Sequence, residues 1–350
     1  MPLNNDSEKK VTIVLAPTLA LAEGYAGEHY VDATVEAEYG DVCIEGKKAT
    51  LAHHGPRSGN PAPCNTEVDP LNGERATILL SHIDLDALGG IMALTGEKPD
   101  DKEFWKAAEY IDVNGSHHMH DLPQNVQDKL NAFYAVEDDL RKEEGPVDRS
   151  SISDVTEAVA KRVSAVEIIL DERHPEHGKY ISAGKEWVEK IEAAVEQQHV
   201  CDTKNARVFI TEGPFTAASY YSPENEKIMP ATVTFNKKFD AITVAFADGG
   251  NADGDKNARK IVQSLWGKEA GGREGIAGSP RGKAMTLRDL VKTVEAVEEA
   301  IEPVTSKDRA YEMGDIREYV SDAIRKEVQE RGLGLDTACL DGHENINRED

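Results

Sequence analysis

The sequence predicts a mixed α/β fold in two domains. Short apolar, β-branched runs at residues 10–16 and 76–82 indicate buried strands. Helical periodicity dominates residues 123–199, and alternating segments typical of strands return near residue 203. With 350 residues, the chain is long enough for one large domain or two ordinary ones. We therefore expect an N-terminal sheet flanked by helices and a smaller C-terminal α/β domain.

The N-terminal elements follow from turn residues and apolar periodicity. Glycine-containing turns within residues 30–52 predict a small β meander, and glycine and proline predict a loop after it. The expected elements, in chain order, are a strand at 10–16, the meander at 30–52, the loop at 53–65, a strand at 76–82 and a helix from about 87. Further helices are expected at 100–110, 122–140, 151–170 and 182–198.

The change near residue 203 from helical periodicity to alternating, strand-like segments predicts the boundary between the domains. Strands are expected at 207–210, 231–235 and 240–247, and helices at 257–267, 287–301 and 315–332. The predicted divisions are a metal-binding domain at 1–202, a substrate-binding domain at 203–302 and a helical tail with a polar end at 303–350. The last helices could pair two protomers, so a homodimer is possible.

The charge balance restricts the ligands that this protein can bind. The formal net charge is −25, from 65 acidic and 40 basic residues. Such a surface repels a long nucleic-acid duplex, because nonspecific affinity for a duplex depends on Lys and Arg neutralising phosphates. We therefore expect no duplex partner, and any phosphate-bearing ligand should be small or single-stranded.

Compartment and membrane association are also predicted from composition. No run reaches the roughly 18 to 20 apolar residues that span a bilayer, and the first residues do not have the pattern of a signal peptide. The four cysteines are scattered without CxxC spacing, which favours neither a disulfide framework nor a zinc knuckle. A cytoplasmic protein without a membrane partner is the expectation.

The segment SHIDLDALGG carries the first candidate metal ligands. His82, Asp84 and Asp86 follow an apolar strand and precede a helix, a position where ligands bind in open α/β sheets. On an extended strand, residues two apart point the same way, so the three side chains could converge. Carboxylates suit hard divalent cations, and an imidazole beside them favours a transition metal such as Mn²⁺.

Two histidine pairs are candidates to complete this site. His53 and His54 follow a predicted strand and open the glycine–proline loop, whereas His117 and His118 follow a predicted helix that carries Asp112 near its end. Asp112 is a candidate metal ligand, and all four histidines are candidate catalytic groups. The sequence does not decide between the two pairs.

The segment GGREGIAGSPRG is the richest glycine run of the chain. Small residues there would let a ligand approach backbone amides, and Arg273 and Arg281 could hold a phosphate. Arg57, in HHGPRS, is a further candidate phosphate contact. The candidate substrate-binding residues of the glycine run are Gly271, Gly272, Arg273, Gly275, Gly278 and Arg281.

Together, these two motifs resemble the DHH phosphoesterase family with its DHH-associated C-terminal domain. SHIDLDALGG resembles the family's His-x-Asp-x-Asp motif, and GGREGIAGSPRG resembles its glycine-rich substrate loop. The resemblance covers roughly residues 10 to 300. It implies two Mn²⁺ ions, with Mg²⁺ or Co²⁺ possible, and a phosphoester held between the two domains. The chain departs from the family because it has no Asp-His-His; the nearest counterparts are Ala52-His53-His54 and Ser116-His117-His118.

The function expected on this basis is metal-dependent hydrolysis of a small phosphoester. His82, Asp84, Asp86 and Asp112 would hold the ions, and an uncoordinated histidine could donate a proton to the leaving group. The substrate could be a short single-stranded oligonucleotide, a cyclic dinucleotide or a phosphorylated metabolite. The alternative is a protein of the same fold that sequesters a nucleotide or signal molecule without turnover. A third possibility is a structural protein whose histidine cluster is incidental.

Overall fold

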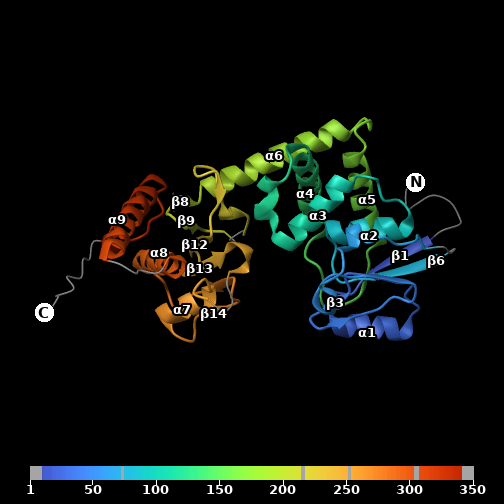
Figure 1. Cartoon of the computed structure of the whole chain (residues 1–350), viewed down its shortest axis with the longest axis horizontal. Helices are drawn as coiled ribbons and strands as arrows, with labels where there is room; N and C mark the ends of the chain where they lie inside the picture. Colours follow the sequence, from blue (N-terminus) through green and yellow to red (C-terminus); the bar gives the residue numbers. More distant parts are fainter. Residues whose placement is uncertain (1–9, 72–74, 214–216, 251–253, 303–306, 341–350) are drawn as a thin grey trace. The chain divides into compact units, whose positions relative to one another are not determined.

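The computed structural model describes residues 10–71, 75–213, 217–250, 254–302 and 307–340. The chain divides into two compact units. The first comprises Met1–Gly115 and Met119–Lys190, and the second comprises Ser116–His118 and Ile191–Asp350. Both units contain a β-sheet and helices (Figure 1), so the predicted mixed α/β class with two domains is confirmed.

The sheet of the first unit is mainly parallel. Its strands are β1 (Lys10–Leu15), β2 (Ala33–Val35), β5 (Ala49–Leu51), β6 (Arg75–Leu80) and β7 (Ser153–Asp154), in the order β5-β2-β6-β1-β7. Only β7 is antiparallel to its neighbour. The predicted meander is wrong, because β2 and β5 are parallel neighbours in this sheet. Between them, only β3 (Glu38–Tyr39) and β4 (Val42–Cys43) form an antiparallel pair.

The four parallel strands end level with one another. Val35 pairs with both Leu51 and Leu80, and Leu80 pairs with Leu15. These residues are the last of their strands. Segments that leave β5, β2 and β6 therefore start side by side along one edge of the sheet.

Helices cover both faces of this sheet. Alternate strand residues bury opposite faces: Val14 and Leu79 pack with Ala22 of α1, whereas Ile13 and Ile78 join a larger core with the helices after β6. Figure 1 shows α1 on one face and α2 on the other. The helices are α1 (Leu19–Glu28), α2 (Leu85–Thr95), α3 (Lys102–Asn114), α4 (Gln124–Glu144), α5 (Thr156–Leu170) and α6 (His177–Glu196). Short 3-10 turns are η1 (Gly55–Arg57), η2 (Pro63–Asn65) and η3 (Ser116–Asp121).

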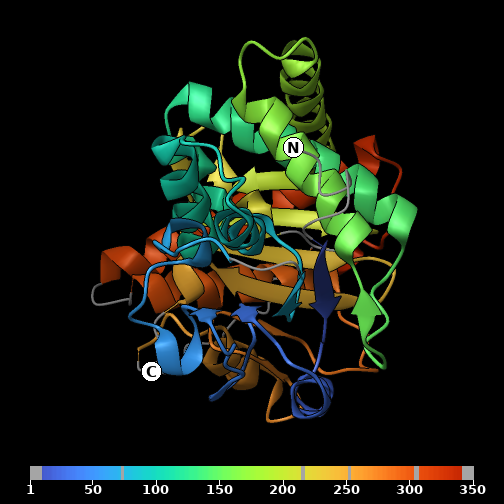
Figure 2. The ribbon, with the colours of Figure 1, turned by 90° about the vertical axis from the view of Figure 1, so that its right-hand side faces the viewer.

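The second unit is built on a six-stranded mixed sheet, seen in yellow and orange in Figure 2. Its strands are β8 (His199–Asp202), β9 (Ala206–Thr211), β12 (Ala231–Asn236), β13 (Ala241–Phe246), β14 (Gly271–Gly272) and β15 (Ile276–Gly278), in the order β14-β15-β13-β12-β9-β8. The helices are α7 (Ala258–Trp266), α8 (Leu287–Ile301) and α9 (Lys307–Glu330). The minor elements are η4 (Ala217–Tyr220), β10 (Tyr221–Ser222), β11 (Lys227–Ile228), η5 (Ala247–Gly249) and η6 (Ala338–Leu340).

Both predicted divisions of the second half differ from the structure. The boundary expected near residue 203 falls after β8, yet β8 pairs with β9 of the second unit, whose main segment starts at Ile191. The described part of the expected tail is not separate, since Val320 and Ile324 of α9 are fully buried in the core of this unit. The predicted polar end, at residues 341–350, lies outside the described residues. Among the described residues, no helix combines the length and apolar character that crossing a bilayer requires.

Candidate metal centre

Three neighbouring strand ends supply the side chains of the candidate site. Glu36 follows β2 directly, and His53 and His54 follow β5 after one residue. His82 follows β6, and Asp84 and Asp86 come at the start of α2. Because these strands end level, the ligands that follow them meet at the carboxyl edge of the sheet, where ligands bind in open α/β folds.

Glu36 lies at the centre of this group and was missed in the sequence. Its side chain is fully buried, and its backbone has a φ of 47°, a left-handed conformation that is uncommon for glutamate. Oε1 lies 3.1 Å from Nε2 of His53, and Oε2 lies 2.7 Å from Nε2 of His82. The two oxygens of one carboxylate therefore face two different histidines.

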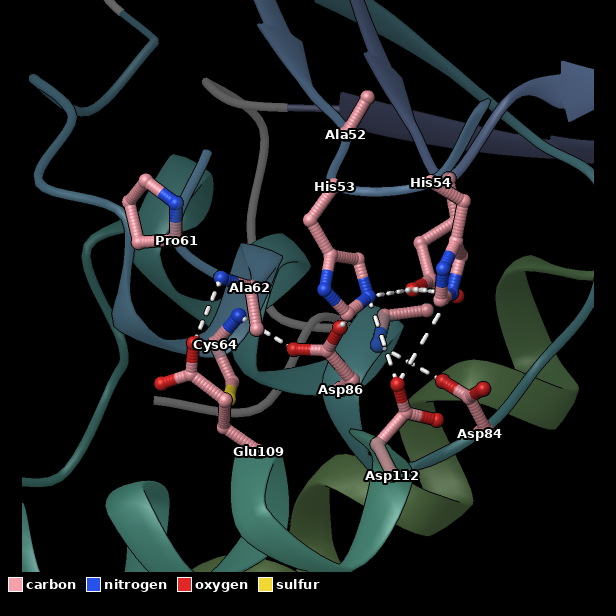
Figure 3. A network of polar contacts seen from close by, with 12 residues as sticks. Ala52, His53, His54, Pro61, Ala62, Cys64, Asp84, Asp86, Glu109 and Asp112 are labelled. Carbon is pink, nitrogen blue, oxygen red and sulfur yellow. Dashed lines mark hydrogen bonds and ion pairs between the residues drawn. The ribbon is translucent and has the colours of Figure 1, made fainter. Parts of the chain in front are cut away.

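His53 has more carboxylate neighbours than one ring N–H can satisfy. Its Nε2 lies 3.1 Å from Glu36 Oε1, 3.1 Å from Asp86 Oδ2 and 3.4 Å from Asp112 Oδ2. Figure 3 shows His53, Asp86 and Asp112 pointing toward one another. A single N–H donates well to one acceptor, and the buried Oδ2 of Asp86 has no hydrogen-bond partner among the described residues. This excess of negative oxygens favours a cation.

The other oxygen of Asp86 is fixed by the turn η2. The backbone N–H of Cys64 donates to Asp86 Oδ1 at 2.7 Å. Glu109 of α3 holds the same turn by accepting from the Ala62 N–H at 3.1 Å (Figure 3). It also accepts from Asn65 Nδ2 at 2.6 Å. This leaves only Oδ2 of Asp86 directed toward His53.

A glycine in α2 permits this arrangement. A Cβ added to Gly89 would lie 2.4 Å from Cys64 Cβ and 2.8 Å from Trp105 Cζ3. The absence of a side chain at Gly89 therefore lets the Cys64 turn approach α2 one turn after Asp86.

The expectation that His82, Asp84 and Asp86 share an extended strand is wrong. β6 ends at Leu80, and Asp84 is the N-cap of α2, where Oδ1 accepts from the Ala87 N–H at 2.8 Å. Oδ2 of Asp84 lies 2.9 Å from His82 Nε2. Asp84 therefore faces His82, whereas Asp86 faces His53, and Glu36 contacts both histidines.

The electrostatics of the site also favour positive charge. Burial lowers the pKa of His53, but its contacts with Asp112, Asp86 and Glu36 outweigh burial and raise the pKa to about 12. Burial likewise lowers the pKa of His82, and Asp84 and Glu36 raise it overall to about 10. The pKa of Glu36 is raised, mainly by burial. Carboxylates that stabilise a proton so strongly on an imidazole would also stabilise a metal ion.

The donor sets suit divalent cations. Ligand atoms of Glu36, His53, His54 and Asp112 lie within 4.8 Å of one another, and so do those of Glu36, His82 and Asp84. Mixed imidazole and carboxylate donors fit Mn²⁺, Co²⁺ or Zn²⁺ better than Ca²⁺. Glu36 is the one residue that belongs to both of these sets.

Only one of the two candidate histidine pairs belongs to this group. His117 and His118 lie in Ser116–His118, which groups with the second unit, and their Nε2 atoms are 3.1 Å and 2.8 Å from Asp248 Oδ1. Neither is among the described residues that gather around Glu36. Within the first unit, the structure thus combines His53 and His54 with the HIDLD segment.

The candidate phosphate contacts lie in two parts of the chain. Arg57 forms an ion pair with Glu45 at 2.6 Å. Arg273 lies in the turn before β15, and Arg281 lies beyond the other end of this three-residue strand.

The glycines of this run have a structural role that the sequence did not reveal. A Cβ at Gly272 would lie 2.4 Å from the carbonyl oxygen of Ile276, and one at Gly275 would lie 2.6 Å from that of Gly249. These two glycines therefore accommodate the protein's own backbone. At Gly271, in contrast, an added Cβ would meet nothing within 4 Å, so a ligand could approach the backbone there as expected. Gly278 lies beside the carbonyl oxygen of Ile242 in the sheet.

No protein-family model matches the sequence, and no curated protein shows significant similarity to it. Geometry and residue chemistry therefore carry the functional argument.

Proposed function

We propose that the first unit is a metal-dependent phosphoesterase with two divalent cations, preferably Mn²⁺. The observation that carries this proposal is the position of Glu36, whose two carboxylate oxygens face His53 at 3.1 Å and His82 at 2.7 Å. A carboxylate shared by two ligand sets is the arrangement that a two-ion site requires. Two-metal sites are typical of enzymes that cleave phosphoesters.

The proposed ligands follow the two sets with one change: Asp86, whose Oδ2 lies 3.1 Å from His53 Nε2, replaces the more exposed His54. His53, Asp86 and Asp112 would hold one ion, His82 and Asp84 would hold the other, and Glu36 would bridge them. Divalent ions bound there would activate water and stabilise charge on the phosphoryl oxygens. The side chain of His54 is 51% exposed, in contrast to 4% for His53. The side chain of His82 is 50% exposed, but His82 is assigned to an ion. We therefore assign to His54 the protonation of the leaving oxygen.

The order of strands in the sheet supports the proposed relationship to DHH phosphoesterases. Ala52-His53-His54 precedes the HIDLD segment in the sequence, but β5 and β6 lie on either side of β2. The histidine pair and the aspartates can therefore meet although their motif order is unusual. The proposed setting is the cytoplasm, which is consistent with the four free cysteines.

Metal content and turnover test this proposal. Protein purified without a histidine tag and loaded with Mn²⁺ should contain two ions per chain by mass spectrometry, and it should hydrolyse bis-p-nitrophenyl phosphate. Asp86→Asn should abolish turnover and lower the metal content, because it removes a buried ligand. Glu103→Gln, at an exposed position of α3, is the matched control and should change neither.

The other outcomes identify the alternatives. Two bound ions and saturable nucleotide binding without turnover on several phosphoesters would favour a sequestering protein. A melting temperature that neither Mn²⁺ nor EDTA changes, together with no retained metal, would overturn the metal site itself, because a ligand that binds the native state stabilises it.

A further inference from the structure

The turn between β12 and β13 presents an exposed aromatic ring in the second unit. The side chain of Phe239 is 68% exposed, the largest exposed fraction among the large hydrophobic residues of the described chain. The turn is well ordered by hydrogen bonds: Asn236 Oδ1 accepts from the N–H groups of Lys238 at 3.0 Å and Phe239 at 3.3 Å. Asn236 Nδ2 in turn donates to the carbonyl oxygen of Gly213 at 2.9 Å. The ring is therefore held in solvent by a fixed backbone.

A second loop is attached to this turn at both ends. The Ser279 N–H donates to the carbonyl oxygen of Ile242 at 2.9 Å, and the Met285 N–H donates to that of Asp240 at 2.8 Å. Met285 is buried, so this end of the loop is also anchored in the core. Residues 279–285 therefore lie beside the Phe239 turn.

A tight turn within this loop presents two cations. The Lys283 N–H donates to the carbonyl oxygen of Pro280 at 3.4 Å, which closes a four-residue β-turn. Gly282, the third residue of this turn, has a φ of 76°, a positive value that favours glycine at that position. Arg281 and Lys283 flank the glycine, and both are exposed. Across the two loops, the basic residues are Lys237, Lys238, Arg281 and Lys283, and Asp240 is the one acidic residue.

Only one of the four cations on this surface is neutralised by an ion pair among the described residues. Lys237 pairs with Glu212 at 2.6 Å. In contrast, Lys238, Arg281 and Lys283 form no ion pair with any carboxylate in the part of the chain that the structure describes. The whole chain has a net charge of −25, whereas these two adjoining loops carry four basic residues and one acidic residue, so the sign of the charge is locally reversed.

We propose that Lys238, Phe239, Arg281 and Lys283, here called the Phe239 platform, bind single-stranded nucleic acid. An exposed aromatic ring stacks on a base of any sequence, and neighbouring cations contact the phosphates. Lys238 Nζ already lies 5.5 Å from the ring centroid, a position from which it can reach the phosphate of a stacked nucleotide. In a duplex the bases stay stacked on one another, so none is free to stack on Phe239. The acidic surface of the protein also repels the phosphates along a long duplex. The inference rests on the proposed function, because it names single-stranded oligonucleotides as its substrate class.

Fluorescence anisotropy of the full-length protein with a labelled single strand of about seven nucleotides tests this assignment. EDTA is present throughout, so hydrolysis does not occur. Phe239→Ala should weaken binding about tenfold or more, because stacking on one base is lost. Phe239→Tyr should restore binding, since it keeps the aromatic face. Tyr319→Ala removes another exposed ring of the same unit and should leave the affinity unchanged.

The salt dependence tests the cations separately. Removing Arg281 and Lys283 together should lower the slope of log affinity against log salt by about 1.4, at about 0.7 for each phosphate contact to a single strand. Lys292→Ala, an exposed change on α8, is the matched control and should keep the slope. Unchanged affinity in Phe239→Ala, equal affinity for duplex and single strand, or no binding by the wild-type protein would each overturn the platform.

These readouts remain separable from the phosphoesterase proposal. If the wild-type protein binds the strand in EDTA but does not hydrolyse bis-p-nitrophenyl phosphate with Mn²⁺, the platform stands and the hydrolase fails. If it hydrolyses the ester and binds the strand equally well with Phe239→Ala, the hydrolase stands and the platform fails.

Discussion

Replacing Gly89 by alanine tests how the packing of α2 supports the metal centre. The added Cβ would lie 2.4 Å from Cys64 Cβ, 2.9 Å from Cys64 Cα and 2.8 Å from Trp105 Cζ3. Two of these atoms belong to the η2 turn close to its backbone, and Trp105 is buried. The clash therefore cannot be relieved by rotating a flexible side chain, and η2 must move away from α2.

The expected loss of stability follows from three effects. Overpacking a core costs about 1–3 kcal/mol. Moving Cys64 weakens its hydrogen bond to the Asp86 carboxylate, and such bonds to charged groups contribute about 1.5–3 kcal/mol. Alanine gains about 1 kcal/mol over glycine within a helix. The net expectation for Gly89→Ala is a decrease of about 2–4 kcal/mol in the free energy of unfolding.

Urea unfolding and metal titration provide the assay. Gly24→Ala is the matched control, because Gly24 also lies in a helix but an added Cβ there meets nothing within 4 Å. That control should gain about 0.5–1 kcal/mol. Gly89→Ala should also lower Mn²⁺ affinity about 10- to 100-fold, as expected when a group that orients a metal ligand is displaced. A Gly89→Ala variant with wild-type stability and metal affinity would refute the argument that η2 orients Asp86.

Three further predictions concern single carboxylates. Glu36→Gln should reduce bound Mn²⁺ below two ions per chain in a metal titration, because a neutral amide is a poor bridging ligand; retention of both ions would contradict the bridging role. Glu109→Gln should weaken Mn²⁺ binding while Glu103→Gln does not, since the introduced amide N–H₂ would face the donors of η2; equal affinity in both variants would argue against this support. Asp202→Asn should lose about 2 kcal/mol at neutral pH, because the contacts with His199, Ser222 and Arg207 outweigh burial and lower the Asp202 pKa from 3.8 to about 2. This stabilisation is present above about pH 4 and is lost as the pH falls toward 2. The difference in free energy of unfolding between the wild-type protein and Asp202→Asn, measured in urea, should therefore shrink over that range. A difference that stays constant would contradict the prediction.

Long or strongly apolar elements were predictable from the sequence, whereas the short ones were not. The runs that form β1 and β6 are six residues each and are mostly apolar, which is the signal of a buried parallel strand. β2 and β5 have three residues each, too few for a pattern to establish pairing or direction. The parallel order of β5 and β2 depends on contacts between distant segments, so the sequence suggested a meander.

The same limitation explains why Glu36 was not found. His82, Asp84 and Asp86 end a long apolar run and are conspicuous, but Glu36 follows a three-residue strand in a segment rich in acidic residues. The signal that could have identified it is the position of an acidic residue directly after the apolar residues of ATV. Choosing His53 over His117 likewise required the sheet order, which places β5 two strands from β6.

Because β5, β2 and β6 end level, metal binding at the proposed site would depend on the correct alignment of these strands. A two-residue slip of β2 against β6 would keep the same faces buried but shift Glu36 by about 7 Å along the sheet. His53 and His82 would then no longer share its carboxylate, and loading of both ions would fail. Divalent cations should therefore select the correctly paired sheet during folding, and chelation should loosen the first unit along these strands before it disturbs the helices.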